Sequence, residues 1–321
     1  MNLGRVMKTH IILIMAVVFS CLSLPACSIN NMAVKAVSDA LTGEGSSDVF
    51  TGDSDPELVG DALPFAIKMY ESLLSINPKH QGLMITTGSL FVMYANAFVQ
   101  GPAEMLPSYE WQAREAAMER AKKLYLRGYE ILYDALETKY RGFRQGIANE
   151  ETRQSFLNRL KKEDVGTLYW AVAGGLSAYS IDLLDFELSA RIPEWNAMIH
   201  KAYDIDPNYG GSALDEFFII FYASLPEMLG GNRELAELHF KKTMEKTGGN
   251  SVGAYVSYAQ NICIPDQDYD TYKDYLEKAL AINPDADIST RLVNIITQRK
   301  ARWLLDNAWT YFSFLPIPDF Y

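Results

Sequence analysis

Residues 268–284 read DYDTYKDYLEKALAINP. Tyrosine, leucine and alanine recur here at three- and four-residue intervals, which places the apolar side chains on one face of a helix. We expect this helix to stop at Asn283-Pro284, because proline pushes the preceding residue out of the α region and asparagine bonds nearby backbone groups. The stretch therefore predicts an amphipathic helix with a defined end.

The same helix stop occurs elsewhere in the chain. Asn77-Pro78 and Asp206-Pro207 each follow an apolar residue at the end of an amphipathic segment, and Gly248-Gly249 provides a glycine C-cap. Pro207 and Gly248 are 41 residues apart, and Gly248 and Pro284 are 36 apart. Both intervals are near the tetratricopeptide period of about 34 residues.

Residues upstream of the stops partly match the second helix of a tetratricopeptide repeat, Ala-x3-aromatic-x2-Ala-x4-Pro. Ala66, Tyr70 and Pro78 fit one copy, and Ala279 and Pro284 fit another. Strand patterns are scarce, so the sequence predicts an all-α fold, a cryptic tetratricopeptide-like helical-hairpin repeat array. The expected helices are 57–76, 82–101, 108–140, 150–162, 164–187, 192–204, 212–229, 231–247, 251–262, 268–282 and 286–309.

The N-terminus has the pattern of an export signal. Residues 1–10 are basic, the run from Ile11 to Leu24 is apolar, and Leu24-Pro25-Ala26-Cys27 is typical of a bacterial lipobox. We therefore predict a signal peptide at 1–26, lipidation of Cys27, a lipidated tether at 27–55 and a helical repeat domain at 56–321. The alternative is an ordinary secretory leader cut near Ala26, with Cys27 incidental.

These features predict a protein of the bacterial cell envelope that is anchored through acyl chains and faces the periplasm. Ser28 follows the cysteine, which favours the outer membrane. The formal charge of −11 argues against a surface that neutralises nucleic-acid phosphates. The chain has three cysteines, two of them in or next to the leader, which leaves no disulfide framework or cysteine-based zinc cluster.

Motifs for catalysis are scarce. The sequence has no Gly-x-Ser-x-Gly elbow, no phosphate-binding glycine loop and no His or Cys at metal-ligand spacing. His80 and His239 are expected at the solvated surface, and His200 at a helix cap. Asp182 and Asp185 lie three residues apart, one turn along the same face of the expected helix. They could bind a cation or act as an acid–base pair, but such a pair is more often a solvated face or bonds a neighbouring arginine such as Arg191.

The segment 213–229 is apolar on more than one face, so it is expected to be buried on more than one side. The simplest interpretation is the core of a helical array. The functional alternative is an apolar ligand groove or oligomer interface, which Pro226 would open by ending the helix. Its candidate residues are Met105, Tyr169, Trp170, Trp195, Phe217, Phe221 and Tyr222.

Several segments together carry a family resemblance: the lipobox, VSDAL at 37–41, DVFTG at 48–52, DPELV at 55–59, ALP at 62–64, YESLL at 70–74, YW at 169–170, PEMLGGN at 226–232 and the aromatic C-terminus. In these the chain resembles the T component associated with TRAP transporters, the TatT family of bacterial lipoproteins. The resemblance implies a helical repeat protein that works beside the substrate-binding P component of a tripartite ATP-independent periplasmic transporter. It also implies self-association, with a trimer as one form, and the handling of hydrophobic ligands.

The leading interpretation is therefore a non-enzymatic, lipid-anchored auxiliary or scaffold subunit beside the P component, with a hydrophobic small molecule as a second partner. No cofactor, metal, catalytic residue or nucleic acid is predicted. One alternative is an envelope assembly scaffold unrelated to transport. The other is a hydrolase-like enzyme with a carboxylate cleft at Asp182, Asp185 and Glu187.

Overall fold

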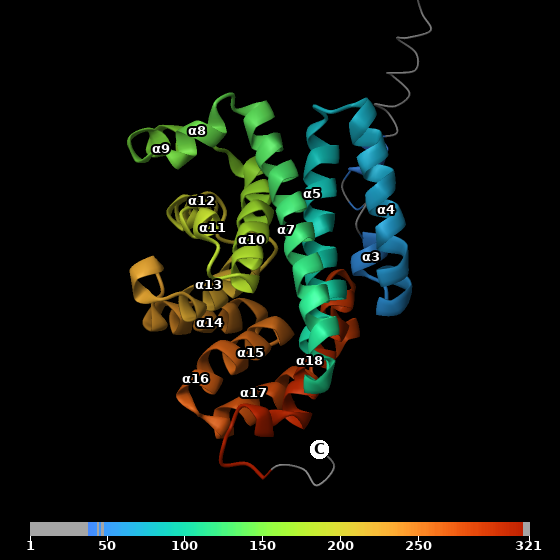
Figure 1. Cartoon of the computed structure of the whole chain (residues 1–321), viewed down its shortest axis with the longest axis vertical. Helices are drawn as coiled ribbons and strands as arrows, with labels where there is room; N and C mark the ends of the chain where they lie inside the picture. The colour runs from blue at the N-terminus through green and yellow to red at the C-terminus, as the bar shows by residue number, and fades with distance from the viewer. Residues whose placement is uncertain (1–37, 44, 46–47, 317–321) are drawn as a thin grey trace, which may run out of the picture.

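The computed structural model describes residues 38–43, 45 and 48–316, and these form helices and turns without a strand (Figure 1). The signal peptide and Cys27 lie outside the described residues. In chain order the helices are α3 (Asp48–Thr51), α4 (Pro56–Ile76), α5 (Gln81–Ala95), α6 (Gly101–Glu104), α7 (Trp111–Lys139), α8 (Phe143–Ala148), α9 (Glu150–Leu157), α10 (Val165–Ile181), α11 (Phe186–Ser189), α12 (Ile192–Ile205), α13 (Ala213–Ser224), α14 (Arg233–Thr247), α15 (Val252–Tyr258), α16 (Ile264–Asp266), α17 (Tyr269–Ala281) and α18 (Arg291–Asp306).

The Asn/Asp-Pro stops end helices as predicted. α4 ends with the Asn77 backbone N–H donating to the Leu73 carbonyl, and α12 ends with Asp206 donating to Ala202. α17 ends at Ala281, three residues before Pro284. These three positions are where the chain turns back and the next helix begins.

One predicted helix is divided in the structure. The segment 164–187 breaks after Ile181, and Asp185 then caps α11 by accepting a hydrogen bond from the Leu188 backbone N–H at 3.0 Å. Aspartate competes for backbone donors through such caps, which a count of apolar residues does not register. Asp182 and Asp185 therefore do not share a helical face, in contrast to the prediction.

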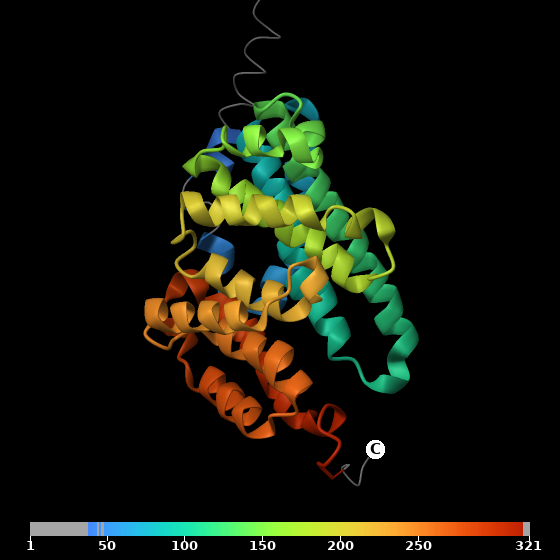
Figure 2. The same ribbon diagram turned by 90° about the vertical axis from the view of Figure 1, so that its left-hand side faces the viewer.

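Successive long helices pack as antiparallel neighbours: α4 against α5, α5 against α7, α7 against α10, α13 against α14, and α15 against α17 (Figures 1 and 2). The all-α class is confirmed for the described residues. Assignment of these pairs to tetratricopeptide repeats stays a prediction, because no regular repeat is established by the helix packing.

The α5–α7 contact is close because glycines face each other. A Cβ added to Gly128 would lie 2.6 Å from the Gly88 carbonyl oxygen, nearer than real Cβ atoms approach backbone. Residues without a side chain let two helix backbones approach to this distance. The glycine pair thus fixes the spacing of the two helices at this point.

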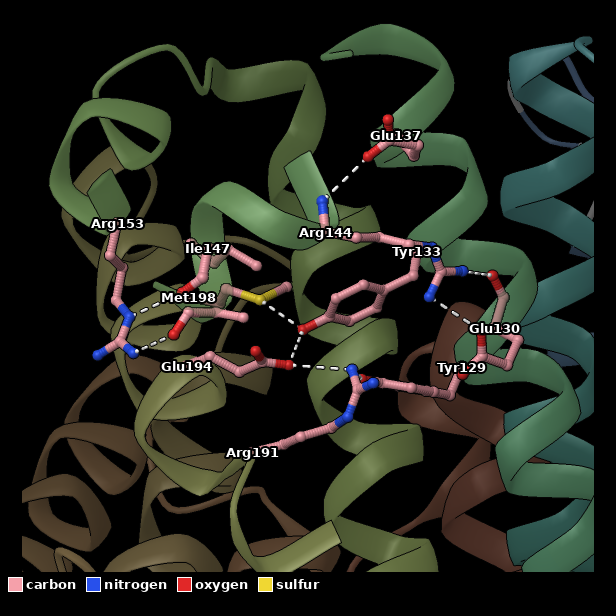
Figure 3. Close-up of polar contacts among 11 residues, drawn as sticks. Tyr129, Glu130, Tyr133, Glu137, Arg144, Ile147, Arg153, Arg191, Glu194 and Met198 are labelled. Carbon is pink, nitrogen blue, oxygen red and sulfur yellow. Dashed lines mark hydrogen bonds and ion pairs between the residues drawn. The ribbon is translucent and has the colours of Figure 1, made fainter. Parts of the chain in front are cut away.

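The largest core lies between α7, α10 and α12, and it contains a buried polar group. Glu194 is buried on α12, where the Tyr133 hydroxyl donates to its Oε1 at 2.9 Å and Arg191 lies 3.3 Å from the same atom (Figure 3). Arg191 also donates to the Tyr129 hydroxyl at 2.6 Å. A buried carboxylate is tolerated only with such partners, so this network ties α12 to α7.

The C-terminal helix returns to the N-terminal helices. Leu292 of α18 is buried with Val59 of α4, and Arg291 donates to the Gly52 carbonyl oxygen at 3.0 Å. Arg299 forms an ion pair with Glu57. The array therefore closes on itself, and α18 joins its last helices to its first.

The described residues of the predicted tether, 38–43, 45 and 48–55, also contact this region. The Tyr70 hydroxyl donates to the Leu41 carbonyl oxygen at 2.8 Å, and α3 packs against α18. Leu41 and Phe50 are partly buried against the core of α4 and α5. The described residues before Pro56 thus lie on the body of the protein.

One continuous helical stretch, Gln81–Glu104, has the length and apolar composition of a membrane span. Half of its most apolar window is buried inside the protein, and it packs between α4, α7 and α10. This burial is the pattern of a central core helix, since its apolar faces are covered by its neighbours.

Candidate functional site

A cavity of about 2040 Å³ lies inside the closed array. Residues from α5, α10, α13, α15 and α18 line it. A smaller surface groove of about 570 Å³ lies between α4 and α7 and is lined by charged side chains, including Glu71 and Arg127 that pair with each other. The larger cavity is the better ligand site, because more aromatic and polar groups converge on it.

Five of the seven sequence candidates line this cavity: Met105, Tyr169, Trp170, Phe217 and Phe221. Trp195 is instead fully buried in the core, where its indole fills the space next to Gly175. Tyr222 points to the core side of α13 and its hydroxyl lies 2.8 Å from His200 Nε2. Tyr222 comes one residue after Phe221, so it points roughly 100° away from it around α13.

The aromatic candidates form one continuous wall. Tyr169 packs on Trp170 with ring centroids 5.2 Å apart, and on Phe217 of α13 at 6.1 Å. Tyr209 extends the wall at 5.6 Å from Tyr169, and Phe221 extends it at 5.9 Å from Phe217. Such edge and offset contacts stabilise the rings against one another.

Pro226 has the predicted effect on this wall. α13 ends at Ser224 and its C-cap Leu225 is extended, so the chain leaves the helix just before the proline. The predicted helix over 212–229 is therefore shorter at its C-terminal end. Ser224 and Leu225 both line the cavity as a result.

Glu216 is a site residue that sequence reasoning missed. It lines the cavity from the first turn of α13, and its Oε1 accepts hydrogen bonds from the hydroxyls of Ser212 and Ser251, each at 2.8 Å. Burial raises the pKa of Glu216, although the two serine hydroxyls oppose this shift. In the sequence it looks like an ordinary acidic residue at a helix start.

The neighbouring Asp215 is buried, with hydrogen bonds to one carboxylate oxygen and an ion pair to the other. His239 donates to its Oδ1 at 2.7 Å, Tyr203 donates to the same atom at 3.0 Å, and Lys246 lies 2.6 Å from its Oδ2. Burial alone would raise the pKa of Asp215, but the bonds from His239, Lys246 and Tyr203 hold it below its usual value. This network joins α13 to α14.

The sequence prediction for His239 was therefore wrong. His239 is buried and stacks on Phe218 with ring centroids 4.7 Å apart. His200, expected at a helix cap, lies inside α12 and donates from Nδ1 to the Asn196 carbonyl oxygen at 2.8 Å. His80 caps α5 by accepting from the Leu83 backbone N–H at 3.1 Å.

Two π-helical segments, Asn96–Gln100 after α5 and Ala259–Cys263 after α15, contribute side chains to the cavity. Such segments are rare and often occur at functional sites, because the extra residue changes which side chains face inward. Gln100 accepts from the Tyr125 hydroxyl at 2.6 Å and donates to Glu104 at 2.7 Å. Lys300 of α18 pairs with Glu104 at 2.7 Å.

Comparison with known proteins identifies the family. The model of the TRAP transporter T-component family matches residues 52–312. The chain belongs to the TRAP transporter T-component family. A protein of Treponema pallidum (strain Nichols), described only as uncharacterized, is 35% identical over 307 residues, which cover 91% of this chain and 95% of that protein.

Membership makes this T component an accessory part of a TRAP transporter and associates it with the bacterial envelope. The family is one of transporter subunits and not a known enzyme class. In the described residues of the T component, Asp182 and Asp185 both bind Lys122, at 2.8 and 3.0 Å. They serve as an ion-pair cluster between α7 and the α10–α11 turn, where Lys122 takes the place predicted for an arginine.

Proposed function

We propose that this protein is the lipid-anchored, periplasm-facing auxiliary subunit that works beside the substrate-binding P component of a TRAP transporter and holds an apolar small molecule in its cavity. Family membership supports the transporter role. The observation that carries the ligand part is the preformed aromatic wall of Tyr169, Trp170 and Phe217 inside the closed array. Anchoring through Cys27 rests on the lipobox.

The cavity is suited to an apolar ligand for two reasons. Its aromatic side chains are held by one another, so little ordering entropy is lost when a ligand binds. Several charged groups of its lining form ion pairs, as Glu104 does with Lys300, which leaves apolar contact with the aromatic side chains as the main attraction. Met105 adds an adaptable side chain at the edge of the lining.

The transporter role is tested by copurification. The chain carrying a C-terminal tag, expressed with its own leader, should retain the transporter's P component from native membranes. Cys27→Ala should move the chain from the membrane to the soluble periplasmic fraction while keeping that association. Absence of the P component from both preparations would contradict the role.

The ligand role is tested with N-phenyl-1-naphthylamine, a neutral apolar fluorophore, on the delipidated protein. We expect the dye to bind and to raise the melting temperature. Phe221→Asp should abolish the shift, and Ile220→Asp should weaken binding by about tenfold, because a charge in the lining opposes apolar contact. Ile220 lines the cavity and is 45% exposed, so its substitution should spare the fold.

Leu238→Asp is the matched control. Leu238 is 44% exposed on α14 and lies outside the cavity lining. Binding should survive in this variant. A folded wild-type protein that binds no dye, or equal loss in Ile220→Asp and Leu238→Asp, would contradict an apolar ligand in the cavity.

A further inference from the structure

Glu216 differs from other carboxylates near the cavity. Glu104 pairs with Lys300 and Asp215 pairs with Lys246, whereas Glu216 has no basic side chain within ion-pair distance among the described residues. Asp287 also lines the cavity, but it is exposed and caps a short helical turn. Glu216 is therefore the carboxylate set deepest in the lining without a cation.

One oxygen of Glu216 is open to the cavity. Both serine hydroxyls donate to Oε1, and Oε2 accepts no hydrogen bond from the described residues. Oε2 faces Gly253 of α15, where an added Cβ would lie 2.7 Å away. Because Gly253 has no side chain, it does not cover this oxygen, and both Glu216 and Gly253 line the cavity.

Aromatic side chains of the cavity lining lie near this carboxylate. Phe217 follows Glu216 on α13, and Tyr169 packs on Phe217 with ring centroids 6.1 Å apart. Burial raises the pKa of the Tyr169 hydroxyl most, and the negative charge of Glu216 nearby raises it further. A carboxylate beside aromatic rings attracts organic ammonium groups, through ion pairing and through the negative ring faces.

Basic groups of the lining do not compete for Glu216. Lys246, Lys278 and Lys300 pair with Asp215, Asp274 and Glu104, respectively. Arg114 also lines the cavity, from α7, and forms no ion pair among the described residues. Arg114 would favour an anionic ligand, whereas Glu216 would favour a cationic one. Comparing a cationic with an anionic probe therefore distinguishes the two residues.

We propose that the cavity binds primary alkylammonium compounds, with the ammonium group on Glu216 Oε2 and the alkyl chain along the aromatic wall of Tyr169, Trp170 and Phe217. This inference rests on the proposed function, because it names the class of the apolar ligand. An ammonium group taken out of water needs a carboxylate and further acceptors to offset the lost hydration. The net charge of −11 favours the approach of cations over anions.

The test compares three probes of equal chain length, octylammonium, 1-octanol and octanoate, by isothermal titration calorimetry on the delipidated protein. We expect octylammonium to bind at least tenfold more tightly than the other two. Glu216→Gln should remove this preference. Glu227→Gln makes the same change of charge at an exposed position after α13 and should keep the preference.

Gly253→Ala provides a second variant that keeps the carboxylate. Its methyl group would occupy the space beside Oε2, so we expect octylammonium to lose at least fivefold in affinity while 1-octanol changes little. Circular dichroism and melting temperature confirm the fold of each variant.

The outcomes separate this inference from the proposed function. Equal binding of the three probes, or tighter binding of octanoate, overturns the ammonium site and leaves the apolar cavity intact. Retention of the octylammonium preference in Glu216→Gln overturns it as well. Failure of all three probes to bind overturns both the ammonium site and the ligand part of the proposed function, while copurification of the P component still decides the transporter role.

Discussion

Among single residues, the acidic pair at the start of α13 divides two roles. Asp215 points into the core, where it accepts a hydrogen bond from His239 and forms an ion pair with Lys246, whereas Glu216 lines the cavity with only hydroxyl partners. Their pKa values move in opposite directions for this reason, down for Asp215 and up for Glu216. Adjacent carboxylates in the sequence thus have different electrostatic surroundings in the fold.

The raised pKa of Glu216 predicts a pH-dependent effect on stability. A group whose pKa is higher in the folded state contributes stability below its unfolded pKa and loses it as pH rises through the folded pKa. Ionised Glu216 therefore weakens the native state at neutral pH. Glu216→Gln should gain free energy of unfolding relative to wild type as pH rises above 4.5, the usual pKa of a glutamate carboxyl.

Urea unfolding at several pH values checks this prediction. The difference between Glu216→Gln and wild type should grow with pH, and Glu227→Gln should show no such trend. A difference that is constant with pH, or that falls, would show that burial does not dominate at Glu216.

Some residues of the site could be predicted from the sequence, and others could not. Tyr169, Trp170 and Phe217 were identifiable because aromatic side chains within an apolar helical pattern stand out. Glu216 was not, since an acid in the first turn of a helix is ordinary. His239 was placed at the surface because charged neighbours in sequence hide the fact that its own side chain faces inward on α14.

Among elements, the predicted helices agree well with the observed ones where a proline or glycine marks the helix end. The Asn/Asp-Pro stops and the Gly248 C-cap end α4, α12 and α14. Agreement is weaker where a short polar residue acts through a side-chain cap, as Asp185 does before α11. The π-helical segments had no sequence signal at all, because their register depends on what packs against them.

The glycine contact between α5 and α7 predicts an unusual mutational effect. Alanine is the better helix former by about 1 kcal/mol, so Gly128→Ala would stabilise an isolated helix. In the protein the new methyl group would meet the backbone oxygen of Gly88 at 2.6 Å, which cannot move aside cheaply. We expect Gly128→Ala to lower the free energy of unfolding by about 1–3 kcal/mol, as overpacking does.

Chemical denaturation measures this change, with Gly166→Ala as the comparison. A Cβ at Gly166 meets the Tyr209 side chain and no backbone outside its own helix, so the ring can move and the loss should be smaller. A stabilised Gly128→Ala variant would mean that the two helices are not held at this spacing.

For the whole molecule, closure of the array decides that there is a cavity. An open stack of helical hairpins presents a concave surface to solvent. Here α18 meets α3 and α4 through Leu292, Arg291 and Arg299, so the inner surface becomes partly enclosed. Lys300 joins the same helix to Glu104 of α6, which places a second contact across the cavity.

Closure predicts a local effect of Leu292→Ala. Removing this buried side chain should cost about 2–5 kcal/mol, the range for large-to-small core substitutions. The loss is expected to appear first as local opening of α3 and α18. Hydrogen–deuterium exchange should therefore rise in α3, α4 and α18, and N-phenyl-1-naphthylamine should bind less tightly.

Val293→Ala is the control, since Val293 is 58% exposed and adjacent in sequence. It should leave exchange in α3 unchanged. If Leu292→Ala increases exchange uniformly over the whole chain instead, then α18 is not an independent closing element.

The amino-acid sequence by itself determined the helical class, the ends of several long helices and the family resemblance, and it predicts the export and lipidation signals. Each of these depends on local spacing, on proline and glycine geometry or on a short linear motif, and local rules suffice for them. Only the tertiary structure decided that the array closes through α18, that Glu216 lines a cavity while Asp215 is neutralised, and that Trp195 lies in the core. Those features depend on contacts between residues far apart in the chain, such as Arg299 with Glu57, whose partners no local pattern specifies.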